Sequence, residues 1–141
     1  MKMSFATTLC AVIVLCMATA TSFAQPSNLG SVKKIYVGSM GQSDEAERFQ
    51  LLLSDELGKV GFSTINDAKD ADAVLTGALS VRVYADESRA RVTVVLKTTD
   101  GARLWGKDFE PRFKLGGTDD SVKLRAQDVA KALRKEVDKA K

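Results

Sequence analysis

The residue types that carry most nucleophilic, redox and metal chemistry are missing from most of this chain. Its 141 residues contain no histidine, and both cysteines, Cys10 and Cys16, lie among the first 24 residues. The remainder therefore cannot form a Ser-His-Asp or Cys-His nucleophilic site, a redox-active thiol or a zinc site of the usual nitrogen and sulfur type. Catalysis there would depend on carboxylates, Lys, Tyr or Ser alone.

Three remaining patterns could carry chemistry, and each has a simpler interpretation. Ser31 and Lys34 have the spacing of the Ser/Lys pair in penicillin-recognising enzymes, but Ser31 precedes a predicted strand rather than opening a helix. Asp108 and Glu110 could act as a pair in glycoside hydrolysis, yet a small domain with one tryptophan offers no sugar cleft. The acids within 66–72 lack the alternating pattern of a calcium loop. We therefore expect no enzyme activity, no catalytic residue, no cofactor and no metal site.

The first 24 residues have the pattern of a cleaved secretory signal peptide. Lys2 is their only charged residue, and the apolar run from Leu9 to Ala18 is 10 residues long. That is short of the roughly 18–20 residues that a membrane-spanning helix needs. Ser22 and Ala24 place small residues at positions −3 and −1 of a cleavage site. We expect cleavage after Ala24, with cleavage after Ala20 as the alternative.

Cleavage also changes the charge and the domain organisation that we expect. Removal of residues 1–24 from the 141-residue chain leaves 117 residues, with 20 basic and 18 acidic side chains. A chain of this length forms one domain. We expect a flexible leader over 25–31, a single domain over 32–141, no transmembrane anchor after cleavage, and a periplasmic or secreted location. The near-neutral charge argues against nucleic acid as the main partner.

Hydrophobic periodicity predicts the elements of this domain. Strands are expected at 32–40 and 62–65. The helix between them is expected to have Asp44 as its cap, with Ser43 as a second candidate cap. Gly61 is expected to end that helix in a left-handed conformation. The later elements are expected to be strands at 73–84, 89–97 and 102–109, a loop at 110–120 and a helix at 122–139. The order βαββββα predicts an α+β domain, with one mixed or antiparallel sheet and both helices on the same face.

A four-residue turn at 85–88 would set the pairing of the strands on either side of it. It places Arg82 opposite Arg91 and Tyr84 opposite Arg89 on a polar face. On the apolar face this register pairs Val81 with Val92, Leu79 with Val94, and Gly77 with Leu96.

The polar face of this sheet is the candidate binding surface. With a three-residue turn and a bulge at Gly101, Trp105 lies on this polar face. With a two-residue turn at 100–101, Trp105 faces the core opposite Leu96. Arginine and aromatic side chains on an open face suit a protein, glycan or nucleic-acid partner. The candidate binding residues are Arg82, Tyr84, Arg89, Arg91 and Trp105.

Three short motifs resemble those of a group of small bacterial envelope domains. They are Gly61-Phe62 after a helix, Ala71-Asp72-Ala73-Val74-Leu75-x-Gly77 at the entry to a strand, and Asp100-Gly101-x-x-Leu104-Trp105. Over about residues 32–138 the chain resembles the periplasmic domain of the curli-secretion channel and the amino-terminal domain of TolB. The resemblance implies a non-enzymatic domain that binds partner proteins or assembles in the envelope.

We therefore expect an exported protein-interaction or assembly module whose partner is an envelope protein. The alternative is a small binder of an anionic polymer, either a nucleic acid or an envelope glycan, that uses the same basic face. Binding to such a polymer would weaken steeply with salt.

Overall fold

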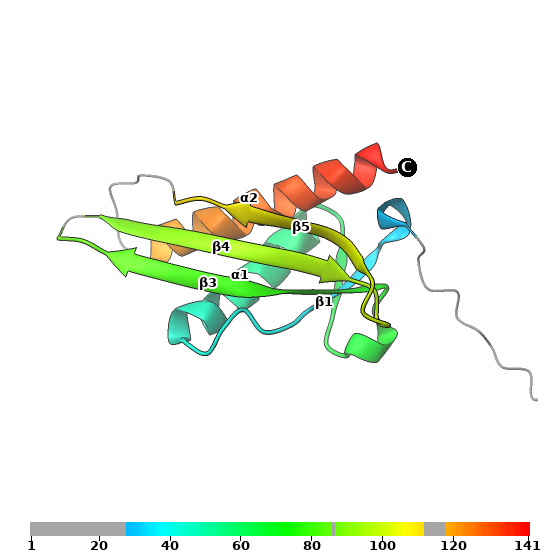
Figure 1. The fold of residues 1–141 in the computed structure, drawn as a ribbon, viewed down its shortest axis with the longest axis horizontal. Coiled ribbons are helices and arrows are strands. Elements are labelled where there is room, and N and C mark those ends of the chain that lie inside the picture. Colours follow the sequence, from blue (N-terminus) through cyan, green and yellow to red (C-terminus); the bar gives the residue numbers. More distant parts are fainter. Residues whose placement is uncertain (1–27, 86, 112–117) are drawn as a thin grey trace, which may run out of the picture.

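The chain forms one five-stranded mixed sheet with both helices packed on one of its faces (Figure 1). The computed structural model describes residues 28–85, 87–111 and 118–141. The strand order is β2-β1-β3-β4-β5, in which β1 pairs in parallel with β2 and β3, and the other pairs are antiparallel. This confirms the predicted α+β class and the order βαββββα. The expected signal peptide lies outside the described residues.

The first unit is strand β1 (Lys34–Val37), helix α1 (Asp44–Lys59) and strand β2 (Ser63–Ile65). Ser43 is the cap of α1, because its side chain accepts a hydrogen bond from the backbone N–H of Ala46. The expectation that Asp44 is the cap was therefore wrong, and Asp44 is the first helical residue. Gly61 has a φ of 92°, and the N–H of Phe62 donates to the carbonyl of Leu57 at 3.1 Å, which is the predicted left-handed helix end.

Strands β3 (Ala73–Val83) and β4 (Ser88–Lys97) form a long hairpin. Its turn closes with the N–H of Tyr84 donating to the carbonyl of Glu87 at 2.8 Å, so Val83 is opposite Ser88. The turn begins one residue earlier than predicted. Every pair is therefore displaced by two residues, and Arg82 lies opposite Arg89 rather than Arg91. The two faces are as predicted, because side chains alternate with a period of two.

The observed apolar pairs replace all three that the predicted turn implied. They are Val81 with Ala90, Leu79 with Val92, Gly77 with Val94, and Leu75 with Leu96.

Strand β5 (Arg103–Phe109) pairs with β4 and forms one edge of the sheet. The turn before it is closed by the N–H of Thr98 donating to the carbonyl of Ala102, and Gly101 within it has a φ of 97°. A shift of register between Leu96 and Lys97 then places Trp105 opposite Leu96. The turn has the longer form considered above, but this bulge turns Trp105 toward the helices, where it packs against the core.

Helix α2 (Thr118–Lys139) closes the fold against β4 and α1. It begins before the predicted Val122, and most of the loop expected at 110–120 lies outside the described residues. The core between the sheet and the two helices is formed by fully buried side chains from every layer. They include Ile35, Phe49, Leu53, Leu57, Leu75, Val92, Val94, Leu96, Val129 and Leu133.

The start of the described chain is packed against the end of α2. Leu29–Ser31 forms a short 3-10 helix, and Leu29 is half-buried against the core. These residues belong to the segment expected to be a flexible leader, of which 25–27 lie outside the described part. Within the described residues, neither α1 nor α2 is long and apolar enough to cross a bilayer.

Candidate functional site

The candidate site is a hollow of about 370 Å³ on the open face of the sheet, next to the β3–β4 turn. Both helices lie behind the other face, so neither covers it (Figure 1). Strand alternation brings the polar side chains of β3 and β4 to this face. We call this hollow the arginine groove, and its lining consists of Ser80, Arg82, Tyr84, Arg89, Arg91 and Pro111.

Two arginines of the groove lie directly opposite each other. Arg82 of β3 and Arg89 of β4 are paired in the antiparallel register. Like charges at opposed positions of a sheet repel each other. Arg82 is exposed, and within the described residues it has no hydrogen-bond or ion-pair partner. This end of the groove therefore has a guanidinium group available to an anion.

Arg89 is held by the turn, but only in part. One terminal nitrogen, Nη2, lies 2.8 Å from Oε1 of Glu87, and its guanidinium lies 5.4 Å from the centre of the Tyr84 ring. Its Nε is buried, and this N–H has no acceptor among the described residues. A buried donor without an acceptor is destabilising. Arg89 therefore has one satisfied side and one side that lacks a partner.

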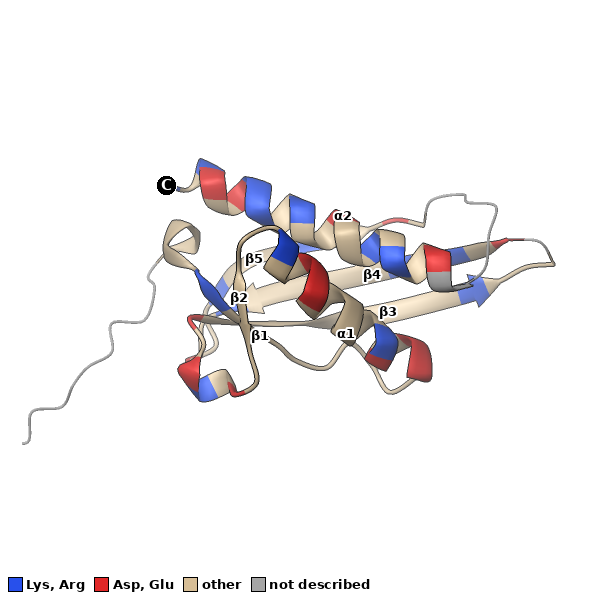
Figure 2. Ribbon diagram, turned by 180° about the vertical axis from the view of Figure 1, so that it is seen from behind, with Lys and Arg blue, Asp and Glu red and all other residues tan. Residues whose placement is uncertain are grey.

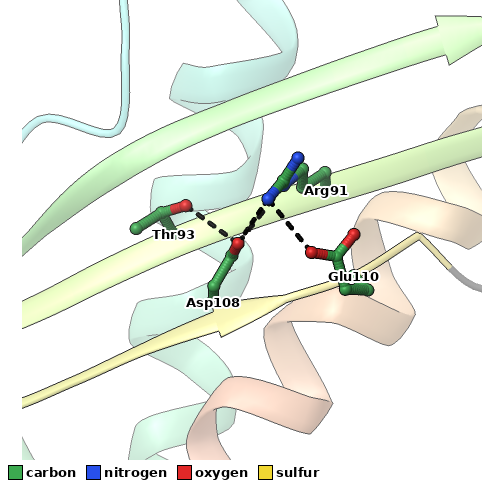
Figure 3. Close-up of polar contacts among 4 residues, drawn as sticks. All are labelled: Arg91, Thr93, Asp108 and Glu110. Atoms are coloured by element: carbon green, nitrogen blue, oxygen red, sulfur yellow. Dashed lines mark hydrogen bonds and ion pairs between the residues drawn. The ribbon is translucent and has the colours of Figure 1, made fainter.

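Arg91 is occupied by two acids at the other end of the groove (Figure 3). Its Nη2 lies 2.5 Å from Oδ2 of Asp108 and 3.0 Å from Oε1 of Glu110. Thr93 donates a hydrogen bond to Oδ1 of Asp108 at 2.9 Å. The hydrogen bond from Arg91, followed by that from Thr93, lowers the pKa of Asp108 below its usual value. The same bond to Asp108 raises the pKa of Arg91.

Asp108 is unsuited to act as a general acid at neutral pH. Its pKa is lowered further below neutrality, so the side chain is ionised and has no proton to give. Glu110 makes an ion pair with the same arginine. The groove offers guanidinium donors, which bind anionic groups, and the ring of Tyr84 lies beside one of them.

With this geometry described, known proteins can be compared. No family model matches the sequence, and neither does any curated protein. The fold is similar to that of PelC. PelC from Paraburkholderia phytofirmans, solved as a dodecamer, has 20% sequence identity and a TM-score of 0.60 over 73% of this chain and 88% of that chain. A second crystal form of the PelC dodecamer gives a TM-score of 0.59, with 20% identity over 70% and 86% of the two chains.

A DUF4136 family protein from Bacteroides thetaiotaomicron is also similar. It has 7% identity and a TM-score of 0.52 over 78% of this chain and 92% of that chain. At these identities the similarity to PelC and to the DUF4136 protein is one of fold. The resemblance to the curli-channel and TolB domains stays a prediction.

Within this PelC-like fold, four of the five predicted binding residues line one groove: Arg82, Tyr84, Arg89 and Arg91. Trp105 is the exception, because it lies opposite Leu96 and packs on the helix side of the sheet. We therefore remove Trp105 from the candidate surface. Glu87 of the turn pairs with Arg89.

The sequence interpretation did not assign Asp108 and Glu110 to the arginines. It considered them only as a carboxylate pair, whereas both bind Arg91. The signal that could have placed Asp108 is the register of β5, in which Phe109 is opposite Val92 and Asp108 is opposite Thr93. That register depends on the bulge before Lys97, which alternation alone does not reveal.

A second hollow, of about 580 Å³, lies between Val60 and the last turns of α2. It is lined by basic residues of the last turns of α2, where Figure 2 shows Lys and Arg along the helix. Two of its four basic residues are paired with acids: Arg134 pairs with Asp138 and lies over the ring of Phe62, and Lys139 pairs with Glu136. The arginine groove differs because it places two guanidinium groups directly opposite each other, and for that reason we take it as the candidate site for an anionic partner.

Proposed function

We propose that this chain is a non-enzymatic, exported protein-interaction module of the bacterial envelope, and that its partner docks on the arginine groove. The observation that carries the proposal is the opposed pair of Arg82 and Arg89 on a face that neither helix covers. Tyrosine and arginine are the residue types that contribute most to protein interfaces. Tyr84 is 48% exposed beside this pair, so the groove holds both types at its open end.

The sheet face is a better docking site than a sheet edge. Strand β2 at one edge has only three residues. Strand β5 at the other edge has a bulge, and its Lys107 is on the same side as the core residue Val94, 5.3 Å from the centre of the Phe109 ring. Short strands, bulges and inward-pointing charges all oppose addition of a further strand. Both edges are therefore protected, while the face is open.

The partner can be another protein or a second copy of this chain. PelC, with a similar fold, was solved as a dodecamer, which supports testing for self-assembly directly. A cross-link identified by mass distinguishes the two partners.

The test is photo-cross-linking in the native host, with a benzoylphenylalanine in place of Ser80 in the groove. The matched control places it at Lys123, an exposed residue of α2 on the helix side. We expect a protein adduct from position 80 and none from position 123, and its loss in the double variant Arg82→Ser/Arg89→Ser. An adduct that forms only from position 123, or that survives the double variant, contradicts the proposal.

A further inference from the structure

We infer that the arginine groove is a carboxylate clamp that binds an acidic peptide segment of the partner between Arg82 and Arg89. This inference rests on the proposed docking function and adds the chemistry of the partner. Three observations carry it: the opposed arginines, the unsatisfied Nε of Arg89 and the composition of the groove around them.

Only one of the two opposed arginines is paired with a carboxylate of the described chain. In the described chain Arg91 has two carboxylates and Arg89 has one, but Arg82 has none. A guanidinium group binds a carboxylate through paired N–H donors in one plane. One carboxylate placed between Arg82 and Arg89 would relieve their repulsion and bind both side chains.

The buried Nε of Arg89 shows where an acceptor is missing. Glu87 satisfies a terminal nitrogen of this guanidinium group, at 2.8 Å, but the Nε–H has no acceptor within the part of the chain that the structure describes. Native proteins leave few buried donors unpaired, so this N–H needs an acceptor that the described residues do not supply. The Arg89 side chain is 43% exposed, and a shift of this side chain would admit a carboxylate oxygen of the partner.

The surroundings of the two arginines favour a peptide over a polyanion. Glu87, Asp108 and Glu110 lie along the same face, and these acids would repel the successive charges of a nucleic acid or an acidic glycan. In a peptide each carboxylate lies on its own flexible side chain, so one carboxylate can enter between Arg82 and Arg89 while neighbouring residues turn away from these acids. Tyr84 and Pro111 provide a wall against which such neighbours can pack.

The experiment is a titration of the purified full chain, labelled with ¹⁵N, followed through the arginine Nε–H signals. The probes are end-capped hexaglutamate, its neutral counterpart hexaglutamine, oligo-dT and oligogalacturonate. We expect hexaglutamate to shift the signals of Arg82 and Arg89, while hexaglutamine does not. Arg82→Ser and Arg89→Ser should each weaken binding at least tenfold. Lys97→Ser, at an exposed position toward the other end of β4, should leave binding within twofold of the wild-type value.

Several results would overturn the inference, and they differ from a failure of the proposed function. Equal shifts with hexaglutamine, or no shift at either arginine, exclude a carboxylate clamp. Tighter binding of oligo-dT or oligogalacturonate than of hexaglutamate shows that the groove takes a polyanion instead. If the cross-link from position 80 persists in any of these cases, docking stands and only the clamp is wrong. If hexaglutamate binds but no protein adduct forms at position 80, the proposed docking function is wrong.

Discussion

Trp105 of β5 lies directly opposite Leu96 of β4, and both side chains face the helices. The bulge before Lys97 produces this pairing, because without it Leu104 would take the position opposite Leu96. The only tryptophan of the chain is thus part of the packing between sheet and helices and not of the open face. Stability and binding can therefore be separated by substitution.

Replacement of Trp105 by Ala should destabilise the fold by about 2 kcal/mol, less than for a fully buried tryptophan because its side chain is half-buried. Trp105→Phe should recover most of this loss. Urea unfolding measures both variants, and hexaglutamate titration below the unfolding transition should give the wild-type affinity. An unfolding midpoint equal to that of the wild type, together with lost binding, would place Trp105 in the site after all.

The sequence predicted correctly which residues of β3 and β4 share a face of the sheet. It did not predict which residues of the two strands lie opposite each other. Alternation of apolar and polar side chains determines the faces of β3 and β4, and a displacement of two residues leaves those faces unchanged. The pairing depends on whether the turn begins at Tyr84 or Ala85, and the composition of the turn is compatible with both. Because the turn begins one residue earlier than predicted, Arg82 lies opposite Arg89 and not opposite Arg91.

The orientation of Trp105 was undetermined for a different reason. Turn length alone gives the wrong answer here, since the longer turn by itself would direct Trp105 outward. The bulge that reverses this places one extra residue, Leu104, in β5. Nothing in the local sequence distinguishes Leu104 from an ordinary strand residue, so its position is decided by packing against the core. The helix end at Gly61 was predictable because its signal is local.

Two glycines at the end of α1 should respond to alanine in opposite directions. Gly58 lies within the helix with open space around the added Cβ, so Gly58→Ala should stabilise the protein by up to about 1 kcal/mol. Gly61 has a φ of 92°, where a side chain is strained, so Gly61→Ala should destabilise it by about 1 kcal/mol. Thermal unfolding of the two variants tests this, and effects of the same sign would contradict the assigned helix end.

A buried hydrogen bond connects the start of β4 to α2. The hydroxyl of Ser88 donates to that of Ser121 at 2.9 Å, and both residues are buried. Ser88→Ala should cost about 1 kcal/mol, because the partner hydroxyl loses one of its bonds. Combining it with Ser121→Ala should cost less than the sum of the two single changes. Denaturant unfolding of all four proteins measures the coupling, and strict additivity would show that this bond does not contribute.

The ion pair between Arg91 and Asp108 should appear in the pH dependence of the carboxylate. Arg91 lowers the pKa of Asp108, so the native state favours the ionised form. The stabilisation is therefore complete above the unfolded-state pKa of Asp108 and is lost as the pH falls through its lower, folded-state value. Arg91→Ser should raise the pKa of Asp108 toward its usual value, and Thr93→Val should raise it by less, because Thr93 is the second contributor. Carboxyl ¹³C signals followed from neutral to acidic pH measure each shift.

The matched control for this titration is Lys97→Ser, which removes a cation from the same strand without removing a partner of Asp108. It should leave the pKa of Asp108 unchanged. Arg91→Ser should also retain the hexaglutamate shifts of Arg82 and Arg89, because Arg91 is already bound to two acids. A pKa of Asp108 that does not respond to Arg91→Ser would mean that the pair in Figure 3 does not persist in solution. In that case Arg91 would be available to the partner as well, and its replacement would weaken hexaglutamate binding.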